Sequence, residues 1–493
     1  MTSRGNAMLQ RLTPPACTTL VLAAVLLICL KIVGYGYVPG GDARRHTARA
    51  FTGKPFRDIV VMKPFYTVDQ SIGWETLLRV IQRATGCSLD ALMGFSVFFL
   101  LAILLAAPMV FLRRPEAWLA AVLGQLIAIP ELPERWTQGR PFLLTETLLI
   151  CLLFAWRRDG NARPSPAQLA LTFAAFTLSV WMHGAWYLWL LPLGAFCLAR
   201  RWRAAAWLAG CWLAGTIVGA ALTGHPVAFL AEQIQMAHAI RAEHLPARLL
   251  VGEFQPHEGE FASVTILAGV YVWTLARRGK SPGLARDPVF WMLFGGWALG
   301  FIADRFWADW GLPAGLVWMA LQFDDGFVVF WPANATSRVL ACGAIAVPLF
   351  LDATNNLHER YTASLHDIYL DAAAPELQGW LPGPGGIFYS AQMSFFYNTL
   401  YRNPRGDWKY ILGFEPALMP DDDLQIFRRI QLSNFASAAY EPWARKLRPI
   451  DRLEIEASSR PNLPELEWKR AAGGDLWLGR LPAAARPESK QKG

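Results

Sequence analysis

Long apolar blocks fill most of the chain up to about residue 352. As helices, blocks of this kind can cross the roughly 30 Å hydrocarbon core of a bilayer. The pattern predicts a polytopic α-helical membrane protein with about eleven transmembrane helices, centred on 18–36, 91–112, 116–131, 140–156, 167–183, 184–199, 204–223, 261–276, 288–303, 311–330 and 338–352. The last two are the least regular, because Asp324 and Asp325 fall at the end of the tenth.

The hydropathy changes at about residue 353, which divides the chain into a transmembrane module (1–352) and a region of ordinary polarity (353–493). That region is long enough for a small soluble domain. The segment 408–412 is typical of a strand, and 421–430 of a helix with an acidic first turn. We therefore expect a small α+β domain after the membrane module.

Three loops on one side of the membrane are longer than the connections require: 37–90, 131–140 and 224–260. The first includes 72–83, whose apolar spacing predicts an amphipathic helix on the membrane surface. The loops on the other side are mostly short and basic. Because loops carry most binding and catalytic residues, function is expected on the face with the long loops.

Composition agrees with a membrane protein, since 54% of the residues are hydrophobic and only 17% are charged. Basic residues recur at every second boundary between apolar blocks, at Arg4 and Arg11 and then at 113–114, 157–158, 200–203 and 277–280. By the positive-inside rule the N-terminus is cytoplasmic, and eleven helices leave the C-terminal domain extracytoplasmic, as in a bacterial cytoplasmic (inner) membrane. The net charge of +8 lies in these loop anchors and does not indicate a nucleic-acid partner.

Asp42 is the leading candidate for chemistry. It lies in Gly-Gly-Asp-Ala-Arg-Arg-His (40–46), just beyond the first apolar block, where no helix needs a carboxylate to stay in lipid. A carboxylate such as that of Asp42 can act as a general base at the membrane surface. If the segment is helical, His46 lies on the same helix face as Asp42. The alternative is that Asp42 only caps a helix and His46 faces water.

Guanidinium groups near these carboxylates are candidate ligands for a phosphate, because arginine presents a planar fork to phosphate oxygens. Arg44 and Arg45 follow Asp42. The second loop combines two candidate catalytic carboxylates with two further candidate phosphate ligands, namely Glu131, Glu134, Arg135 and Arg140. The alternative for this loop is a solvated turn.

Two polar side chains interrupt apolar sequence. Glu146 falls inside the fourth block, where an ionised carboxylate is costly unless it is paired or hydrated. His183 lies among aromatic residues and is a candidate substrate contact, although a lone histidine in such a place is more often structural.

The segment 304–311, Asp-Arg-Phe-Trp-Ala-Asp-Trp-Gly, combines carboxylates, an arginine and tryptophans at one expected membrane boundary. Such a set can hold a sugar, because its rings stack on aromatic faces and its hydroxyls bond to carboxylates. The candidate substrate-binding residues are Asp304, Arg305, Asp309 and Trp310. The alternative is an interfacial aromatic belt with an aspartate–arginine pair.

The topology and Gly41-Asp42 with His46 resemble the GT-C superfamily of membrane glycosyltransferases, in which an outer loop after the first span carries a catalytic acidic residue. The resemblance implies an enzyme that transfers a sugar from a polyprenyl-phosphate-linked donor to a glycan, lipid or protein acceptor, by inverting attack. The donor's lipid tail would lie between spans. The superfamily includes metal-independent members and users of a divalent metal, so the resemblance implies no particular cofactor.

Other functions stay open at this stage. A transporter is an alternative from a different class, and Glu146 would then be its buried charge. An envelope polysaccharide polymerase or ligase would use arginines and histidines in a late outer loop, as in 224–260, which contains His225, His238, His244 and His257. A structural assembly factor is a third. The sequence indicates neither the sugar, nor the acceptor, nor the length of the lipid.

Overall fold

Helices cover each of the eleven apolar segments in a computed structural model of the chain. The structure describes residues 3–157, 163–242, 246, 249–279, 283–330, 335–367, 369–471 and 474–482. The chain divides into two compact units. The helical unit contains 1–39, 70–233 and 244–365, and the mixed unit contains 40–69, 234–243 and 366–493.

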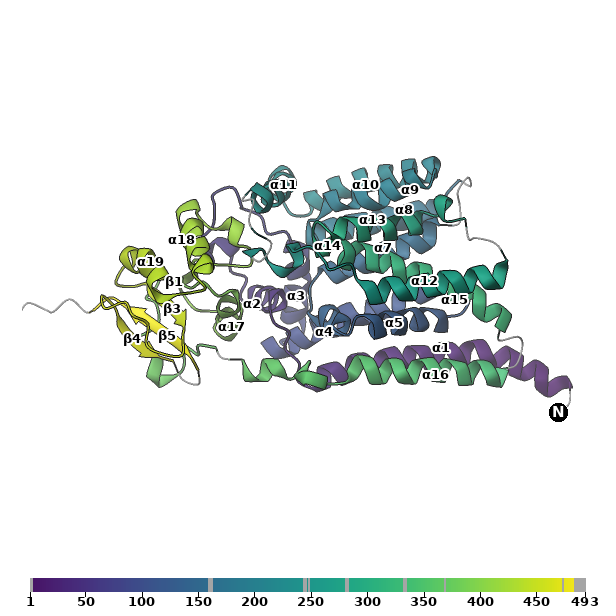
Figure 1. Cartoon of the computed structure of the whole chain (residues 1–493), viewed down its shortest axis with the longest axis horizontal. Helices are drawn as coiled ribbons and strands as arrows, with labels where there is room; N and C mark the ends of the chain where they lie inside the picture. The colour runs from purple at the N-terminus through teal and green to yellow at the C-terminus, as the bar shows by residue number, and fades with distance from the viewer. Residues whose placement is uncertain are drawn as a thin grey trace, which may run out of the picture. The chain divides into compact units, whose positions relative to one another are not determined.

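The helical unit is built from long helices joined by short turns (Figure 1). Its helices are α1 (Ser3–Gly34), α3 (Ile72–Thr85), α4 (Leu89–Ala106), α5 (Glu116–Ala128), α6 (Leu132–Thr137), α7 (Phe142–Trp156), α8 (Pro166–His183), α9 (Leu190–Leu198), α10 (Trp202–Ala221), α12 (Phe261–Arg278), α13 (Pro288–Gly300), α14 (Asp304–Phe306), α15 (Leu312–Phe330) and α16 (Ala335–Thr354). The division between the units falls inside α11 (Pro226–Ala242), a helix in the third long loop that hydropathy did not predict.

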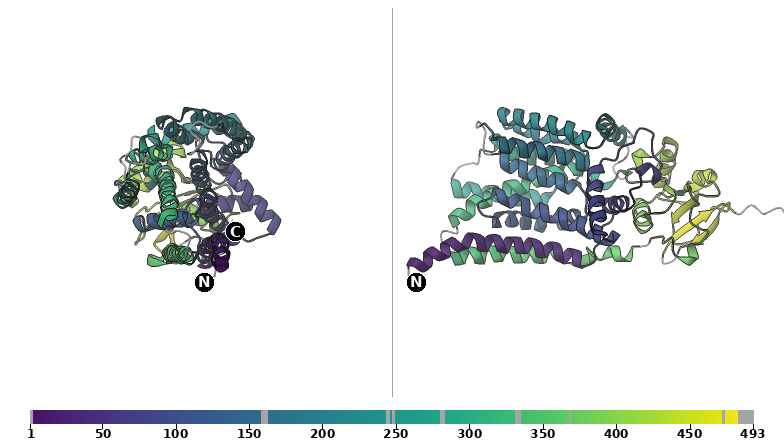
Figure 2. Two further views of the ribbon diagram at one scale, coloured as in Figure 1. Left: turned by 90° about the vertical axis from the view of Figure 1, so that its right-hand side faces the viewer. Right: turned by 180° about the vertical axis from the view of Figure 1, so that it is seen from behind.

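Close helix packing in this unit depends on small residues. A Cβ added at Gly215 of α10 would lie 2.7 Å from the Cβ of Phe176 on α8, and one at Gly219 would lie 2.7 Å from the carbonyl oxygen of Thr177. Glycine at both positions therefore lets the two backbones approach, as small residues do in membrane helix pairs. The helices α1 and α16 also run side by side, although they are far apart in the sequence (Figure 2).

Four helical segments are long and apolar enough to cross a membrane: Pro15–Gly34, Leu89–Phe111, Trp202–Ala221 and Thr336–Thr354. Several of the other apolar helices are shorter, among them α5 and α7, which have 13 and 15 residues. At about 1.5 Å per residue such helices span roughly 20 Å, less than the hydrocarbon core. The eleven segments are therefore confirmed as helices, while the number of them that cross the membrane stays a prediction.

Asp324 and Asp325, which made the tenth segment irregular, are paired. The Oδ2 atom of Asp324 lies 3.2 Å from Nε of Arg113, and its Oδ1 accepts a hydrogen bond of 2.9 Å from the backbone of Arg114. The Oδ2 atom of Asp325 lies 2.6 Å from Arg278 at the end of α12. Arg113, Arg114 and Arg278 belong to the basic boundaries from which the orientation was predicted. They also compensate the charge of the two carboxylates in α15.

The mixed unit is an α+β fold around a five-stranded sheet (Figure 1). The strands β1 (Ile387–Tyr389), β2 (Lys409–Tyr410), β3 (Arg452–Glu456), β4 (Glu467–Arg470) and β5 (Leu476–Arg480) lie in the order β2-β1-β3-β5-β4. β1 is parallel to β2 and β3, whereas β5 is antiparallel to β3 and β4. Its helices are α2 (Asp42–Thr52), α17 (Met393–Arg402), α18 (Asp421–Leu432) and α19 (Glu441–Lys446). The strand expected at 408–412 is shorter than predicted, and the helix expected at 421–430 is confirmed as α18.

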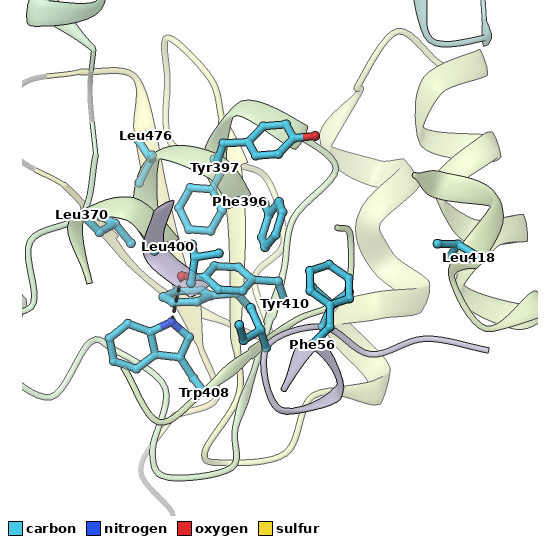
Figure 3. Close-up of a cluster of buried hydrophobic side chains, with 14 of the residues drawn as sticks. Phe56, Leu370, Phe396, Tyr397, Leu400, Trp408, Tyr410, Leu418 and Leu476 are labelled. Atoms are coloured by element: carbon cyan, nitrogen blue, oxygen red, sulfur yellow. Dashed lines mark hydrogen bonds between the residues drawn. The ribbon is translucent and has the colours of Figure 1, made fainter. Parts of the chain in front are cut away.

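The segment 40–69 is part of this second fold. Val60 forms a parallel bridge with Tyr410 at the β2 edge, and the backbone of Lys63 donates a hydrogen bond of 2.8 Å to the carbonyl of Leu418. Phe56 packs in the same hydrophobic cluster as Tyr410 and Leu400 (Figure 3). The division at residue 352 expected from hydropathy therefore differs from the division by compactness. The first long loop supplies part of the mixed unit, and residues 353–365 belong to the helical unit.

Candidate functional site

Asp42 is the first residue of α2, and Gly41 is the residue that precedes the helix. Gly41 has φ 79°, a backbone conformation that favours glycine, and it has no side chain that could cap the helix. The side chain of Asp42 is 25% exposed. The structure thus confirms the helix that would place Asp42 and His46 on one face, with Gly41 at the position that precedes its first residue.

Two side chains contact the same oxygen of Asp42. The hydroxyl of Tyr397, on α17, donates a hydrogen bond of 2.9 Å to Oδ1. The Nε atom of Arg45, one turn along α2, lies 3.4 Å from the same Oδ1. Both contacts stabilise a negative charge, so the arrangement holds Asp42 as an oriented carboxylate.

Arg45 is completely buried within the mixed unit. Its Nη1 lies 2.9 Å from Oδ2 of Asp69, which also pairs with Arg49, and its guanidinium lies 4.2 Å above the ring of Phe414. A charge in such a place has to be paired, and here it is. The sequence predicted Arg45 as a phosphate ligand, whereas these contacts favour a role in holding Asp42.

Arg44 of α2 is also buried, and its side chain contacts α17. It donates hydrogen bonds to Asn398 and to Asp367, whose Oδ2 is 2.5 Å from Nη2. The side chain of Arg44 is 4% exposed, so, like Arg45, it contacts other protein groups rather than water or lipid. Asp69, Asp367, Tyr397 and Asn398 were not predicted from the sequence, because each lies at least 20 positions from its partner on α2.

One alternative placed His46 in contact with water, but the side chain does not face water. It is buried, and its Nε2 lies 3.2 Å from Nη2 of Arg45. Because a guanidinium can only donate, Nε2 is the acceptor and the proton of the neutral ring is on Nδ1. Burial, together with the charge of Arg45, lowers the pKa of His46 to about 3. At neutral pH the ring is therefore an uncharged acceptor and is poorly suited to exchange protons.

A second cluster lies within the helical unit and is centred on Asp309. Trp307–Gly311 form a π-helical turn between α14 and α15, an irregularity found frequently at functional sites. The packing of this turn on α13 requires glycine in both elements. A Cβ on Gly296 of α13 would lie 2.4 Å from Cα of Gly311, and a Cβ on Gly311 would lie 2.8 Å from the ring of Trp307. Asp309 is buried there with a side chain that is 4% exposed.

Asp309 bridges two arginines that are distant in sequence. Arg135 of the second loop donates to Oδ1, and Nε of Arg305 lies 3.1 Å from Oδ2. Burial acts to raise the pKa of Asp309, but the charges of Arg135 and Arg305 outweigh it and hold that pKa below its usual range. Asp304 differs, because burial raises the pKa of its carboxyl and Arg135 offsets this only in part. Glu146 of α7 is also buried, and the charges of Asp309 and Arg135 act on its carboxyl group.

Aromatic rings enclose this cluster. The guanidinium of Arg305 lies 5.4 Å from the ring of Phe142 and 5.7 Å from that of Phe254. The ring of Phe142 also contacts His183 and Trp310, at centroid distances of 4.7 Å and 6.1 Å. Trp310 is fully buried, so its ring is part of the packing rather than an exposed platform for a sugar.

The structure therefore brings together most of the candidates that the helical unit contains. Arg135, His183, Arg305, Asp309 and Trp310 are linked by the contacts above. Arg140 pairs with Glu253. Glu131 and Glu134, the two candidate catalytic glutamates of the second loop, are exposed at the start of α6.

The third long loop has a structural histidine. His257 is buried, accepts a hydrogen bond of 2.8 Å from the backbone of Gly259 at Nδ1, and lies 2.9 Å from the carbonyl of Trp297. His244 lies outside the described residues. Within the part of the chain that the structure describes, no group of three or more His, Cys, Asp or Glu is arranged to hold a metal ion.

Comparison with known proteins shows the fold. No protein-family model and no curated protein matches the sequence. The structure is similar to the crystal structure of ArnT from Cupriavidus metallidurans in the apo state, with a TM-score of 0.57 over 94% of this chain and 96% of that one. The two sequences are 14% identical, so the likeness concerns the fold. It supports the GT-C fold expected from the sequence, and with the long apolar helices it indicates an integral membrane protein.

Proposed function

We propose that this protein is a membrane glycosyltransferase that transfers a sugar from a polyprenyl-phosphate-linked donor to an acceptor on the outer face of the membrane. The observation that carries the proposal is Asp42, a partly exposed carboxylate held by Tyr397 and Arg45 directly after the first apolar helix. The ArnT-like fold and the long apolar helices agree with a lipid-linked substrate.

In the proposed reaction Asp42 is the general base. It accepts the proton of an acceptor hydroxyl, whose oxygen attacks the anomeric carbon of the donor. The bond between that carbon and the phosphate oxygen breaks, and its electron pair leaves with polyprenyl phosphate. Direct attack inverts the anomeric centre. His46 supports the neighbouring charges as a neutral acceptor and carries no proton in this scheme, since burial lowers its pKa to about 3.

Arg135 and Arg140 are the proposed ligands of the donor phosphate. Their side chains are 24% and 32% exposed, in contrast to the buried Arg44 and Arg45. Both are paired with a carboxylate, Arg135 with Asp309 and Arg140 with Glu253. Such pairing fixes the orientation of a guanidinium and leaves it further donors, because the group has five N–H bonds. In this proposal Asp309 positions Arg135.

The test is transfer by purified protein in a defined detergent–lipid mixture. Undecaprenyl-phosphate sugars, labelled in the sugar, are offered with an envelope extract as the source of acceptor. Asp42→Asn keeps the size and polarity of the side chain but removes the base, which typically costs on the order of 10²–10⁴ in rate. Asp407→Asn is the matched control, because Asp407 is exposed within the same unit and pairs only loosely with Lys54 at 3.3 Å.

Loss of transfer in Asp42→Asn with normal yield and thermal stability supports the proposal, provided that Asp407→Asn behaves as the parent protein. Near-parental transfer in Asp42→Asn would contradict the role of Asp42. Movement of the labelled donor across vesicle membranes without sugar transfer would favour the transporter alternative instead.

A further inference from the structure

Tyr397 connects the C-terminal part of the chain to Asp42. It lies on α17, a helix whose neighbouring residues Phe395, Phe396 and Leu400 are buried in the core of the mixed unit. These apolar side chains fix the helix against the sheet. The hydroxyl of Tyr397 points away from the rings of Phe396 and Tyr410, at the edge of the cluster (Figure 3).

The helix α17 contacts α2 through two consecutive polar residues. Tyr397 donates to Oδ1 of Asp42 at 2.9 Å, and Asn398 accepts from Arg44. The packing of α17 on α2 and the buried position of Tyr397, which is 8% exposed, leave the hydroxyl little freedom to turn elsewhere. A hydrogen bond made by a buried tyrosine to a carboxylate is of the stronger, charge-assisted kind.

The second contact with Asp42 is itself held in place. Arg45 reaches Oδ1 through Nε, while its Nη1 is bound to Asp69 and its Nη2 to His46. One contact, an ion pair, therefore comes from α2, and the other, a hydrogen bond, comes from α17; both meet the same oxygen. A hydrogen bond and an ion pair from different helices restrain a carboxylate better than either alone, because rotation about its bonds would lengthen both contacts.

We propose that Tyr397 is a positioning residue for Asp42, so that the C-terminal region 366–493 completes the catalytic site. This inference rests on the proposed function, in which Asp42 is the base. The hydroxyl of Tyr397 does not react. It orients the carboxylate toward the acceptor hydroxyl and favours the charged form that accepts the proton.

A purely structural hydrogen bond makes a different prediction. In that case loss of the hydroxyl lowers stability and reduces the amount of active protein, but it leaves the rate per folded molecule and its pH dependence unchanged. Among the groups that face Asp42 are Tyr397 from α17 and Arg45 and His46 from its own helix, with Asp69 acting through Arg45. Of these, Tyr397→Phe removes a single hydroxyl and no charge.

The experiment compares Tyr397→Phe with the parent and with Tyr410→Phe. Tyr410 is a buried tyrosine of the same unit whose hydroxyl accepts a hydrogen bond of 3.0 Å from Trp408, so Tyr410→Phe loses a comparable bond away from Asp42. Each protein is assayed with undecaprenyl-phosphate sugar and envelope extract across pH, and its unfolding midpoint is measured in the same detergent. Asp42→Asn is assayed alongside.

We expect kcat of Tyr397→Phe to fall roughly tenfold or more, with KM for the donor within about twofold of the parent. The acid limb of its pH–rate profile should move to higher pH, because the charged carboxylate has lost a donor. Tyr410→Phe should keep the parental kcat and pH profile, whatever its stability.

Parental kcat and an unshifted acid limb in Tyr397→Phe, with Asp42→Asn inactive, would overturn this inference alone. A fall in kcat without a shift of the acid limb, matched by Tyr410→Phe and by a lower unfolding midpoint, would assign Tyr397 a structural role and also overturn it. Parental transfer by Asp42→Asn would remove the proposed function first, and the inference with it.

Discussion

Arg45 and Asp69 form an ion pair inside the mixed unit, with 2.9 Å between Nη1 and Oδ2 and with side chains that are 0% and 1% exposed. Asp69 also pairs with Arg49. One buried carboxylate therefore compensates two buried guanidinium groups, while Arg45 in turn contacts Asp42. The pair links the interior of the unit to the proposed base.

Asp69→Asn should destabilise the protein strongly. The substitution keeps the shape of the side chain but removes the negative charge that two buried cations share, and breaking one buried pair costs about 3–5 kcal/mol. The measurement is the thermal unfolding midpoint in detergent. Asp407→Asn is the control, because its carboxylate is 79% exposed and pairs of that kind contribute about 1 kcal/mol or less. Equal midpoints for the two variants would contradict this account of the pair.

Arginine should not be replaceable by lysine in the second loop. We expect at least one of Arg135→Lys and Arg140→Lys to weaken donor use more than it weakens folding, because an ammonium group lacks the planar fork that binds two phosphate oxygens. Initial rates are measured against the concentration of undecaprenyl-phosphate sugar, and stability is measured in the same mixture.

Arg338→Lys is the matched control for these variants. Arg338 also lies in the helical unit and pairs with a buried carboxylate, with Nε 2.7 Å from Glu116, but it is not among the candidate residues. It should lose stability without a change in donor dependence. Parental donor dependence in both Arg135→Lys and Arg140→Lys would show that the second loop does not bind the phosphate.

The N-terminus should be cytoplasmic, and the residues after about 353 should be exported. The reason is the recurrence of basic residues at every second boundary between apolar segments. Reporter fusions after residues 360 and 493 check this with one enzyme active only in the cytoplasm and another active only outside. Cytoplasmic activity at both fusion points would refute the arrangement with eleven crossings.

Glu454 should make the stability of the mixed unit depend on pH. It is fully buried in β3, and burial raises its pKa to about 8 from an ordinary value of 4.5. Between these values the unfolded state releases the proton and the folded state keeps it, so stability falls as pH rises from about 4.5 to about 8. The size of this effect is on the order of a few kcal/mol.

Glu454→Gln removes the titrating group and should flatten this dependence. The unfolding midpoint is followed from pH 5 to pH 8 for the parent and the variant. Glu465→Gln, an exposed site of the same unit, should retain the parental slope. If the parent and Glu454→Gln show the same slope, protonation of Glu454 does not control stability in this range.

Much of the local structure was predictable because it follows from neighbouring residues. Apolar blocks became helices at all eleven positions, 72–83 became α3, and the acidic turn at Asp421 begins α18. The hydropathy of a block depends on its own residues, which is why these elements could be recognised. The pattern overestimated the strand around Tyr410, because strand length depends on the partners that pair with it.

The sequence by itself determined a helical membrane protein, a second region of mixed structure and Asp42 as a helix-borne carboxylate at the end of the first apolar block. Only the tertiary structure decided that 40–69 folds with the C-terminal residues, that Arg44 and Arg45 are buried, and that Tyr397 reaches Asp42 across 355 positions. The physical reason is that hydrophobic periodicity and the distribution of charged residues depend on residues close together in the sequence. The partner of a buried charge is instead selected by the packing of distant elements, which no local pattern encodes.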